Sequence, residues 1–327
     1  MLNPTHLRTV TVAVRTGSFA ETARLLGYTT SAVSQQIAML ERAVGTQLFE
    51  RSARSVRPTA VAEQMAMLSR DALAALSELE REVRALTRGD AGTLRLASFA
   101  TANAPILASA LAAIMKHRPD ADILLDEGEP DEVLADVLDG DRDAAVVFAY
   151  DLDPRSWPRE LVTVPLLTDP LVLVTSPGHR LASRADASLA EIADERWIST
   201  SNDTAGFKSL ERLCATAGFR PRVTLRSNDY GTIASLVRRG LGVAIVPKLA
   251  MSNDIGLGVL RIAGADVSRR ILALHRPGNT NPLLPMLLDA LRSQGRVIAE
   301  RWVDGDRQRS LCAPVESTAA SLSRSAT

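Results

Sequence analysis

Residues 17–45 read Gly17-Ser-Phe-Ala-Glu-Thr-Ala-Arg-Leu-Leu-Gly-Tyr-Thr-Thr-Ser-Ala-Val-Ser-Gln-Gln-Ile-Ala-Met-Leu-Glu-Arg-Ala-Val-Gly45, and this stretch decides the fold of the N-terminal region. A serine followed three residues later by a glutamate, as at Ser18 and Glu21, is the capping box that begins many helices. This first helix covers 20–26 and ends at a glycine, and a second begins near Thr30. Two helices joined by so short a turn predict a helix-turn-helix.

The second helix has two contrasting faces. At about 100° per residue, one face is apolar and must meet a core: Val33, Ile37, Leu40 and Val44. The opposite face carries small or hydrogen-bonding side chains and no acid: Ser31, Gln35, Ala38 and Arg42, with Ser34 on its flank. Serine and glutamine can read base edges in the major groove. A plain amphipathic surface helix explains this pattern equally well.

Arginines occupy every third position after this helix. Leu48 and Phe49 are apolar anchors, and Arg51, Arg54 and Arg57 follow them. The segment suits a β-wing that touches the DNA backbone or minor groove, although spaced arginines are more often a solvated face. Residues 1–58 hold seven arginines against three glutamates, a local charge of +4 in a chain that is neutral overall. Such an excess suits phosphate contacts.

The run Ala23-Arg-Leu-Leu-Gly-Tyr-Thr-Thr-Ser-Ala-Val-Ser-Gln-Gln-Ile-Ala-Met-Leu-Glu-Arg-Ala-Val-Gly-Thr-Gln-Leu-Phe-Glu-Arg51 resembles the signature of LysR-type transcriptional regulators. The resemblance implies a winged helix-turn-helix over 1–58 that binds double-stranded DNA. It also implies base-facing and wing residues, namely Thr30, Ser31, Ser34 and Gln35 for the bases and Arg51 and Arg54 for the wing. The pattern commonly has Gln-Pro at 30–31, a basic residue at 35 and Thr-Glu-Ala-Gly at 59–62. The first two departures leave the operator sequence open.

Residues 59–88 contain no glycine or proline and predict one long helix, within a linker at 59–89. Seven of its residues follow the heptad spacing of a coiled-coil seam, and all but one serine are apolar: Met65, Ser69, Ala72, Leu76, Leu79, Val83 and Leu86. At about 1.5 Å per residue the helix is about 45 Å long, and alone it would leave this stripe in water. Pairing with a second chain is the favoured interpretation, and docking on the chain's own C-terminal domain is the alternative. A dimer would present two heads to a pseudo-palindromic operator.

From residue 93 onward the pattern changes to strands alternating with helices. Apolar runs at 94–97, 123–125, 144–149, 171–174 and 243–246 predict buried parallel strands, so the overall fold class is α/β. Three polar turns, at 98–101, 199–204 and 227–232, connect a strand to a helix. Helix starts offer free amides to an anion or polar ligand. From Val303 to 327 the composition predicts a mobile tail.

Ligands in open α/β sheets bind outside the carboxyl ends of strands, so these turns converge only if two lobes face each other. The resemblance implies such a domain over 90–302, similar to type II periplasmic solute-binding proteins. Lobe one is expected at 92–164 and 269–300, and lobe two at 166–266. Candidate contacts to a small-molecule effector are Ser98, Phe99, Thr101, Thr200, Ser201, Asn202 and Asp229, with Glu127 or Phe148 beside them. Helix capping explains any one of these positions as well as ligand contact does.

Several function classes lack their motifs. There is no Gly-x-Ser-x-Gly turn, P-loop or His-Glu-x-x-His pair, so we expect no enzyme, no metal and no cofactor. Two cysteines, Cys214 and Cys312, exclude a disulfide framework. Neither a secretory pattern nor a window of ~18 apolar residues occurs, which favours a cytoplasmic location without a membrane partner. A ligand-responsive regulator, as a dimer or a dimer of dimers, is therefore favoured over a solute-binding transport protein or an enzyme of the same two-lobe fold.

Overall fold

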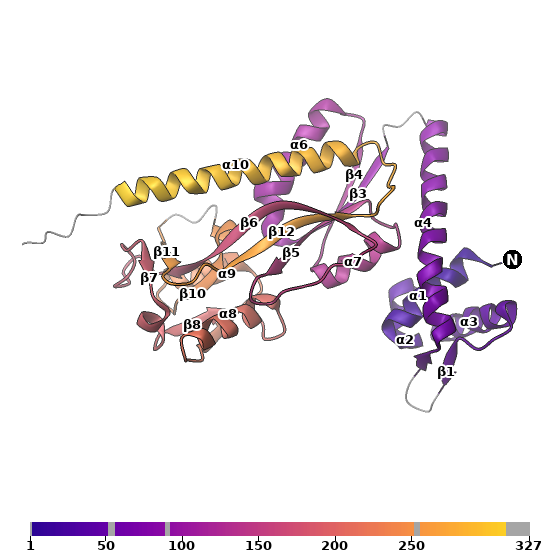
Figure 1. The fold of residues 1–327 in the computed structure, drawn as a ribbon, viewed down its shortest axis with the longest axis horizontal. Helices are drawn as coiled ribbons and strands as arrows, with labels where there is room; N and C mark the ends of the chain where they lie inside the picture. Colours follow the sequence, from indigo (N-terminus) through magenta and orange to yellow (C-terminus); the bar gives the residue numbers. More distant parts are fainter. Residues whose placement is uncertain (1, 52–55, 89–91, 252–255, 312–327) are drawn as a thin grey trace, which may run out of the picture.

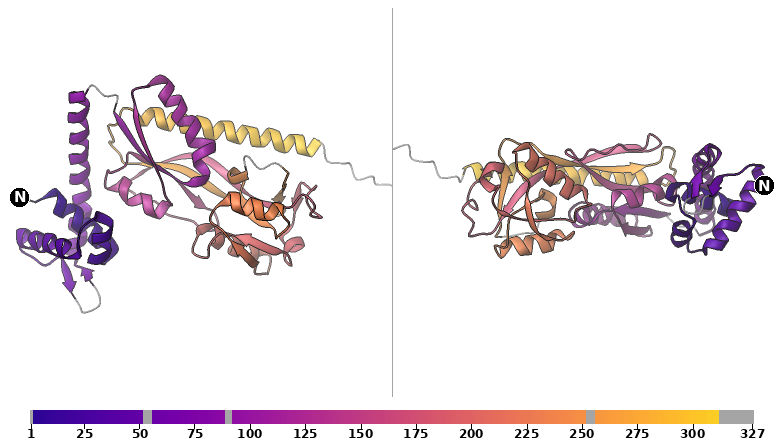
Figure 2. Two further views of the ribbon diagram at one scale, coloured as in Figure 1. Left: turned by 180° about the vertical axis from the view of Figure 1, so that it is seen from behind. Right: turned by 90° about the horizontal axis from the view of Figure 1, so that it is seen from below.

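The computed structural model describes residues 2–51, 56–88, 92–251 and 256–311. The chain forms an N-terminal head, one long helix and a C-terminal two-lobed region. Figure 1 and Figure 2 show the head at one end of an elongated molecule.

The head consists of three helices and a wing: α1 (Pro4–Thr16), α2 (Phe19–Leu26), α3 (Thr30–Val44), β1 (Phe49–Arg51) and β2 (Val56–Pro58). Its core confirms the predicted apolar face of α3, because Val33, Ile37 and Leu40 are all buried. The rings of Phe19 and Phe49 meet edge to face, with centroids 5.2 Å apart, and join the base of the wing to α2.

Half of the predicted capping box forms at the start of α2. The Ser18 hydroxyl accepts a hydrogen bond from the amide of Glu21 at 3.3 Å. The glutamate does not return the bond, because its carboxylate accepts from Nε of Arg24 at 2.9 Å. The hydrogen bond from Arg24 lowers the pKa of Glu21, and the Ser18 amide donates to Thr16 Oγ1 instead.

The long helix α4 (Ala60–Arg88) has three faces. The first is buried on the side of the head: Ala62, Ala66, Ser69 and Leu73. The second, formed by Arg70, Asp71 and Ala74, meets the C-terminal region. The third is exposed and apolar: Val61, Leu68, Ala72, Leu76, Leu79 and Val83. At about 100° per residue, the third face lies roughly 160° from the second.

The predicted seam is therefore wrong at its first two positions. Ser69 is buried and Met65 packs against the core of the head, so neither is available to a second chain. The side chain of Leu86 lies outside the described residues. The actual stripe instead begins at Val61 and Leu68, which are 47% and 59% exposed.

The C-terminal region is built on an eight-stranded sheet in the order β4-β3-β5-β12-β6-β11-β7, with β10 also pairing β6. Its strands are β3 (Thr93–Ser98), β4 (Asp122–Glu127), β5 (Ala144–Tyr150), β6 (Val162–Thr175), β7 (Asp186–Ala187), β10 (Ala244–Pro247), β11 (Gly258–Ile262) and β12 (Ser268–His275). Strands β8 (Arg196–Ser199) and β9 (Arg222–Arg226) form a separate parallel pair.

Parallel pairing is confirmed for β3 with β4 and β5. It is wrong for the run at 171–174, and the run at 243–246 is mixed, because 244–246 pair antiparallel with β6 while Val243 bridges Trp197 in parallel. The long strand β6 is antiparallel to β12 along 162–170 and to β10 and β11 along 171–175. It therefore belongs to both lobes and is one of the crossing strands between them. Leu124 and Leu125 are 47% and 40% exposed, because β4 lies at the edge of the sheet, so the expectation of a buried strand there is also wrong.

Helices cover the sheet: α5 (Ala100–Ala102), the π-helical turn η1 (Asn103–Leu107), α6 (Ala108–His117), α7 (Pro130–Leu138), η2 (Leu189–Ile192), α8 (Ala205–Thr216), α9 (Tyr230–Arg238), η3 (Lys248–Met251) and α10 (Leu284–Leu311). The expected tail is wrong at its start, because α10 continues past Val303 to Leu311. Helix α10 lies close to β6, since a Cβ on Gly295 would be 2.1 Å from the carbonyl oxygen of Leu166.

Candidate functional site

The outer face of α3 carries the four residues predicted to read bases. Thr30, Ser31 and Gln35 are exposed and Ser34 is half-buried. The helix begins after Thr29, whose hydroxyl accepts a hydrogen bond from the amide of the third helical residue at 3.2 Å. The four side chains thus lie near a helix N-terminus, where backbone amides and the helix dipole favour phosphate.

Two adjacent glutamines of α3 differ in their surroundings. Gln36 accepts a hydrogen bond from the hydroxyl of Thr9 at 2.5 Å and is held against α1. Gln35, one position earlier, is exposed. Of these two glutamines, only Gln35 is therefore presented on the outside of the head.

Glu41, the single acid of α3, points away from this outer face. Its Oε1 accepts hydrogen bonds from the amides of Leu48 at 2.8 Å and Phe49 at 3.3 Å, which lie at the start of the wing. The carboxylate therefore positions the wing and leaves the outer face without a negative charge. Sequence reasoning did not assign Glu41 this role, although its being the only acid in a fifteen-residue helix was a signal.

The predicted wing arginines are only partly described. Arg54 lies outside the described residues, and Arg51 is described only as the last residue of β1. Arg57 is exposed on β2, in register with Glu50 on β1.

The buried cation Arg269 lies where the two lobes join. Its side chain is 2% exposed, its Nε donates to Asp169 Oδ2 at 2.9 Å, and its Nη2 donates to Thr101 Oγ1 at 2.7 Å. The guanidinium carbon lies 5.1 and 5.3 Å from the ring centroids of Phe99 and Phe148, within the range of a cation–π contact. These contacts come from both lobe one and the crossing strand β6.

The carboxylate of Asp169 is also fully buried. Its Oδ1 accepts a hydrogen bond from the amide of Leu249 at 2.9 Å, so it connects β6, β12 and η3. Burial raises the pKa of Asp169, and the charge of Arg269 opposes that shift. The pair is buried without a net charge, and each partner satisfies the other.

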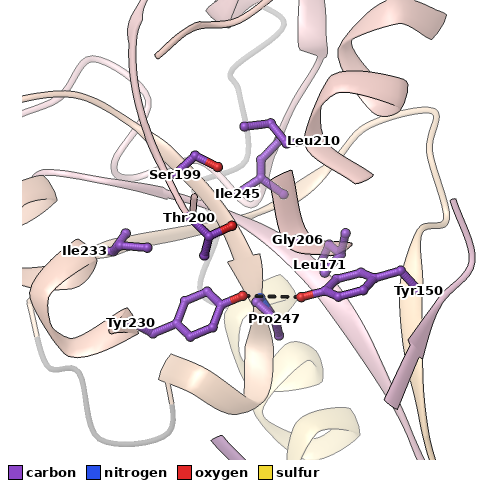
Figure 3. Close-up of a pocket in the computed structure, with 10 residues that line it drawn as sticks. All are labelled: Tyr150, Leu171, Ser199, Thr200, Gly206, Leu210, Tyr230, Ile233, Ile245 and Pro247. Atoms are coloured by element: carbon purple, nitrogen blue, oxygen red, sulfur yellow. Dashed lines mark hydrogen bonds between the residues drawn. The ribbon is translucent and has the colours of Figure 1, made fainter. Parts of the chain in front are cut away.

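Two tyrosines meet across the lobes. Tyr150 ends β5, Tyr230 begins α9, and their hydroxyl oxygens lie 3.2 Å apart (Figure 3). Burial raises the pKa of both phenols. A cavity of about 10 Å³ lies beside them. Its lining is partly polar and partly apolar: Tyr150, Leu171, Ser199, Thr200, Gly206, Leu210, Tyr230, Ile233, Ile245 and Pro247. This is space for about one water molecule.

Gly206 leaves room for this hydroxyl cluster. A Cβ at that position would lie 3.1 Å from Thr200 Oγ1, 3.4 Å from the Tyr230 hydroxyl and 3.5 Å from the Tyr150 hydroxyl. A larger cavity of about 710 Å³ is also lined by Tyr230, and its size is typical of small-molecule sites. It is lined by Ala100, Thr101, Ala104, Pro105, Glu127, Asn228, Asp229, Tyr230, Gly231, Leu249 and Ala250.

The structure brings some of the predicted effector residues together and not others. Thr101, Asp229 and Glu127 line the larger cavity, and Thr200 lines the smaller one. Phe99 and Phe148 pack on Arg269. Ser98 is fully buried. Ser201 and Asn202 line neither cavity.

Capping accounts for the position of Asp229. Its carboxylate accepts hydrogen bonds from the amides of Gly231 and Thr232, both at 3.0 Å, and from the Thr232 hydroxyl at 2.6 Å. These hydrogen bonds lower the pKa of Asp229, and the bond from the Thr232 hydroxyl has the largest effect. The residue lines the cavity while capping α9, so the two interpretations of this position are compatible.

Sequence reasoning missed the centre of the cleft: Arg269, Asp169, Tyr150 and Tyr230. One signal was present, because Asp169 interrupts the apolar strand around it and a buried acid requires a partner. Nothing in the sequence marked Arg269 as that partner.

Other candidate chemistry is limited within the described residues. No group of three His, Cys, Asp or Glu side chains there could hold a metal ion. No helix there is long and apolar enough to cross a membrane. Cys214 is buried, which raises the pKa of its thiol to about 12, and Cys312 lies outside the described residues.

Comparison with known proteins places both halves of the chain. Residues 4–63 match the family model of the bacterial regulatory helix-turn-helix protein, lysR family, and residues 87–296 match that of the LysR substrate binding domain. A probable transcriptional regulator, LrrA of Synechococcus elongatus, is 30% identical over 300 residues, which are 89% of this chain and 97% of that protein. The small neutral protease regulatory protein of Streptomyces coelicolor is 31% identical, covering 74% and 76% of the two chains.

Solved structures have the same fold. A full-length OxyR variant from Pseudomonas aeruginosa superposes with a TM-score of 0.61 at 18% identity, covering 89% of this chain and 95% of that one. CbnR in complex with its target DNA gives a TM-score of 0.52 at 22% identity, covering 89% and 99%. With its helix-turn-helix head, its two-lobed substrate-binding domain and both family models matched, the chain belongs to the LysR family of DNA-binding transcriptional regulators.

Proposed function

We propose that α3 reads operator DNA in the major groove through Thr30, Ser31, Ser34 and Gln35, and that Arg51 and Arg54 contact the backbone. The observation that carries this proposal is the outer face of α3, where Gln35 is exposed and the only acid of the helix, Glu41, is turned to the wing. A helix face free of negative charge can approach phosphates closely. Because its proposed partner is the bacterial chromosome, we place the protein in the cytoplasm.

Footprinting on the DNA upstream of the chain's own gene tests the DNA-reading face. We expect a protected site, and its absence at low salt would refute the proposal. Gln35→Ala should relax base preference by about 1–3 kcal/mol at one position, whereas Arg51→Ala should weaken all sequences and reduce the salt slope by about 1. Gln64→Ala, another exposed helical glutamine, is the matched control. Equal weakening of every sequence by Gln35→Ala would contradict the base contact.

We also propose that two chains pair through the exposed apolar face of α4. Leu68, Leu79 and Val83 are each about half exposed, at 59%, 56% and 49%, and pairing would remove this stripe from water. Light scattering should therefore give at least a dimer at micromolar concentration. Leu79→Glu should shift the protein toward the monomer, and Glu63→Gln, on the same helix but outside the stripe, should not. A wild-type monomer, with and without DNA, would contradict the pairing.

The cleft between the lobes is the proposed effector site. Its two cavities share Tyr230 and are lined by residues of both lobes, so a bound small molecule would favour one angle between them. A thermal-shift screen of the full chain against common bacterial metabolites should find a stabilising compound. Ala104→Trp should weaken or abolish that shift, because its side chain would fill part of the larger cavity, whereas Ala112→Trp, exposed on α6 and outside both cavities, should not. A shift that survives Ala104→Trp unchanged would place the site elsewhere.

A further inference from the structure

The turn that follows α7 connects the head and α4 to lobe one of the same chain. Asp141 Oδ1 lies 2.6 Å from Nη2 of Arg8 on α1, and Asp139 Oδ1 lies 3.6 Å from Nε of Arg70 on α4. Between these two acids, a Cβ on Gly140 would lie 3.0 Å from the Cβ of Ala74. The glycine has φ +78°, so this close approach uses a conformation that other residues rarely adopt.

Arg276 completes the contact from the other side of lobe one. Its Nη2 donates to Asp71 Oδ1 at 3.2 Å, and its Nη1 donates to the carbonyl oxygens of Arg70 at 3.5 Å and Leu138. The side chain of Arg276 is 20% exposed. One guanidinium therefore ties α4 to the end of α7. We call this contact the joint: Arg8, Arg70, Asp71 and Ala74 on one side, and Leu138–Asp141 with Arg276 on the other.

The joint is polar rather than tightly packed. A cavity of about 270 Å³ lies within it, lined from both sides: Asp71, Ala74, Ala75, Gly140, Arg142, Asp143, Arg276, Pro277, Gly278 and Asn279. Three ion pairs around a cavity can separate without exposing an apolar core. A contact of this kind suits reversible attachment.

Two neighbouring strands run from the joint to the cleft. Strand β5 begins directly after the turn of the joint and ends at Tyr150, and β12 begins near Arg269 and ends one residue before Arg276. The two pair in register over their whole shared length, from Arg269 opposite Tyr150 to His275 opposite Ala144. At about 3.3 Å per residue this ribbon spans roughly 20 Å. One end of the ribbon carries the cleft residues Tyr150 and Arg269, and the other end lies beside the joint.

We propose that the joint holds the head against lobe one of its own chain, and that β5 and β12 couple this attachment to the state of the cleft. The exposed apolar face of α4 points roughly 160° away from the joint, so attachment and pairing of two chains do not compete for the same surface. The joint is defined by contacts within one chain. Its test needs neither operator nor effector, and its failure is therefore distinguishable from failure of the proposed function.

Crosslinking tests the attachment. In a Cys312→Ser background, Arg8→Cys with Asp141→Cys should be joined by a short bismaleimide within one chain, as read by peptide mass spectrometry. Arg24→Cys with Asp141→Cys is the matched control, because Arg24 lies on α2 and pairs with Glu21. Equal yields from the two pairs, or crosslinks only between chains, would overturn the joint.

Charge reversal gives a second test of the attachment, which needs no introduced cysteine. Asp141→Arg should enlarge the radius of gyration in small-angle scattering, and the added change Arg8→Asp should reverse most of this effect by restoring the pair. A surface ion pair shifts an equilibrium by up to about fivefold, or ~1 kcal/mol. Glu21→Lys, which breaks the exposed pair within the head, should leave the radius unchanged. An unchanged radius in Asp141→Arg would count against ionic attachment.

The coupling to the cleft has its own readout. Tyr230→Phe removes the hydroxyl that meets Tyr150 across the lobes. It should change the crosslinking rate of the Arg8→Cys, Asp141→Cys pair about twofold or more, because one hydrogen bond between the lobes is lost. Tyr28→Phe, an exposed tyrosine in the head, should not change that rate. Equal rates in Tyr230→Phe and the parent would overturn the coupling.

Discussion

On α3 the candidate DNA-reading side chains come from residues 30–35 of one helix, whereas in the cleft Arg269 reaches Thr101 across 168 positions of the chain. The α3 side chains are exposed, and the apolar residues that hold the helix lie on its opposite face. In the cleft the buried polar residues also hold the lobes together. The candidate binding residues are therefore separate from the core in the head and adjacent to buried structural residues in the cleft, and the following changes test that difference.

The largest effect is expected from Asp169→Ala. Removing the acid leaves the buried guanidinium of Arg269 without its partner, which should lower the free energy of unfolding of the C-terminal region by about 3–5 kcal/mol. All three tryptophans, Trp157, Trp197 and Trp302, lie in this region, so urea unfolding followed by tryptophan fluorescence reports it alone. Asp186→Ala, which breaks an exposed pair with Arg261, should change the result by less than about 0.5 kcal/mol. Equal effects of the two changes would contradict the role of the buried pair.

Ile37→Ala should destabilise the head by about 2–5 kcal/mol, because the side chain is fully buried. Thermal melting followed by circular dichroism should show an earlier transition, while the tryptophan transition stays in place. Met39→Ala, on the same helix but 40% exposed, should have a much smaller effect. If the two transitions instead shift by the same amount, the head and the lobes unfold together.

Asp229 should make a smaller and pH-dependent contribution. An N-cap is worth about 1 kcal/mol, and the lowered pKa means that this stabilisation is present above the usual carboxyl value of 3.8 and is lost as the pH falls through the folded-state pKa. Asp229→Ser keeps a cap that does not titrate. The stability difference between wild type and Asp229→Ser should therefore shrink or reverse in acid, as measured by urea unfolding at pH 7 and below pH ~4. A constant difference would contradict the pKa shift.

The smallest effect on stability is expected from Gln35→Ala. Since the side chain is exposed, the free energy of unfolding should change by less than about 0.5 kcal/mol. Gln36→Ala should cost more, because it removes the hydrogen bond with Thr9. The pair of variants separates recognition from stability at adjacent positions, and a larger loss in Gln35→Ala than in Gln36→Ala would contradict this assignment.

The head could be predicted because its rules are local. A 3.6-residue period placed Val33 and Ile37 in the core, and Gly27 and Gly45 marked the ends of helices. The error at the start of the α4 seam arose because Met65 and Ser69 fit a heptad, although Met65 packs against the core of the head and Ser69 is buried. Periodicity identifies an apolar stripe but not the partner that covers it.

The cleft could be predicted only in outline. Polar turns at strand ends indicated where the lobes meet, and Thr101 and Thr200 do line the cavities there. The pairs Arg269–Asp169 and Tyr150–Tyr230 depend on the register of antiparallel strands and on the angle between lobes. Neither quantity has a local signal in the sequence. The antiparallel pairing of β6 was missed for the same reason, because a buried apolar run does not reveal the direction of its neighbours.

The opposed faces of α4 constrain the layout of an assembled pair. When two chains meet through the exposed apolar stripe, the joint of each chain lies on the far side of its α4 helix. The two lobed regions then lie on opposite sides of the paired helices. In this layout the paired helices and the heads form a continuous physical route between the two clefts, so a binding event in one lobed region would reach the other through the shared helix interface.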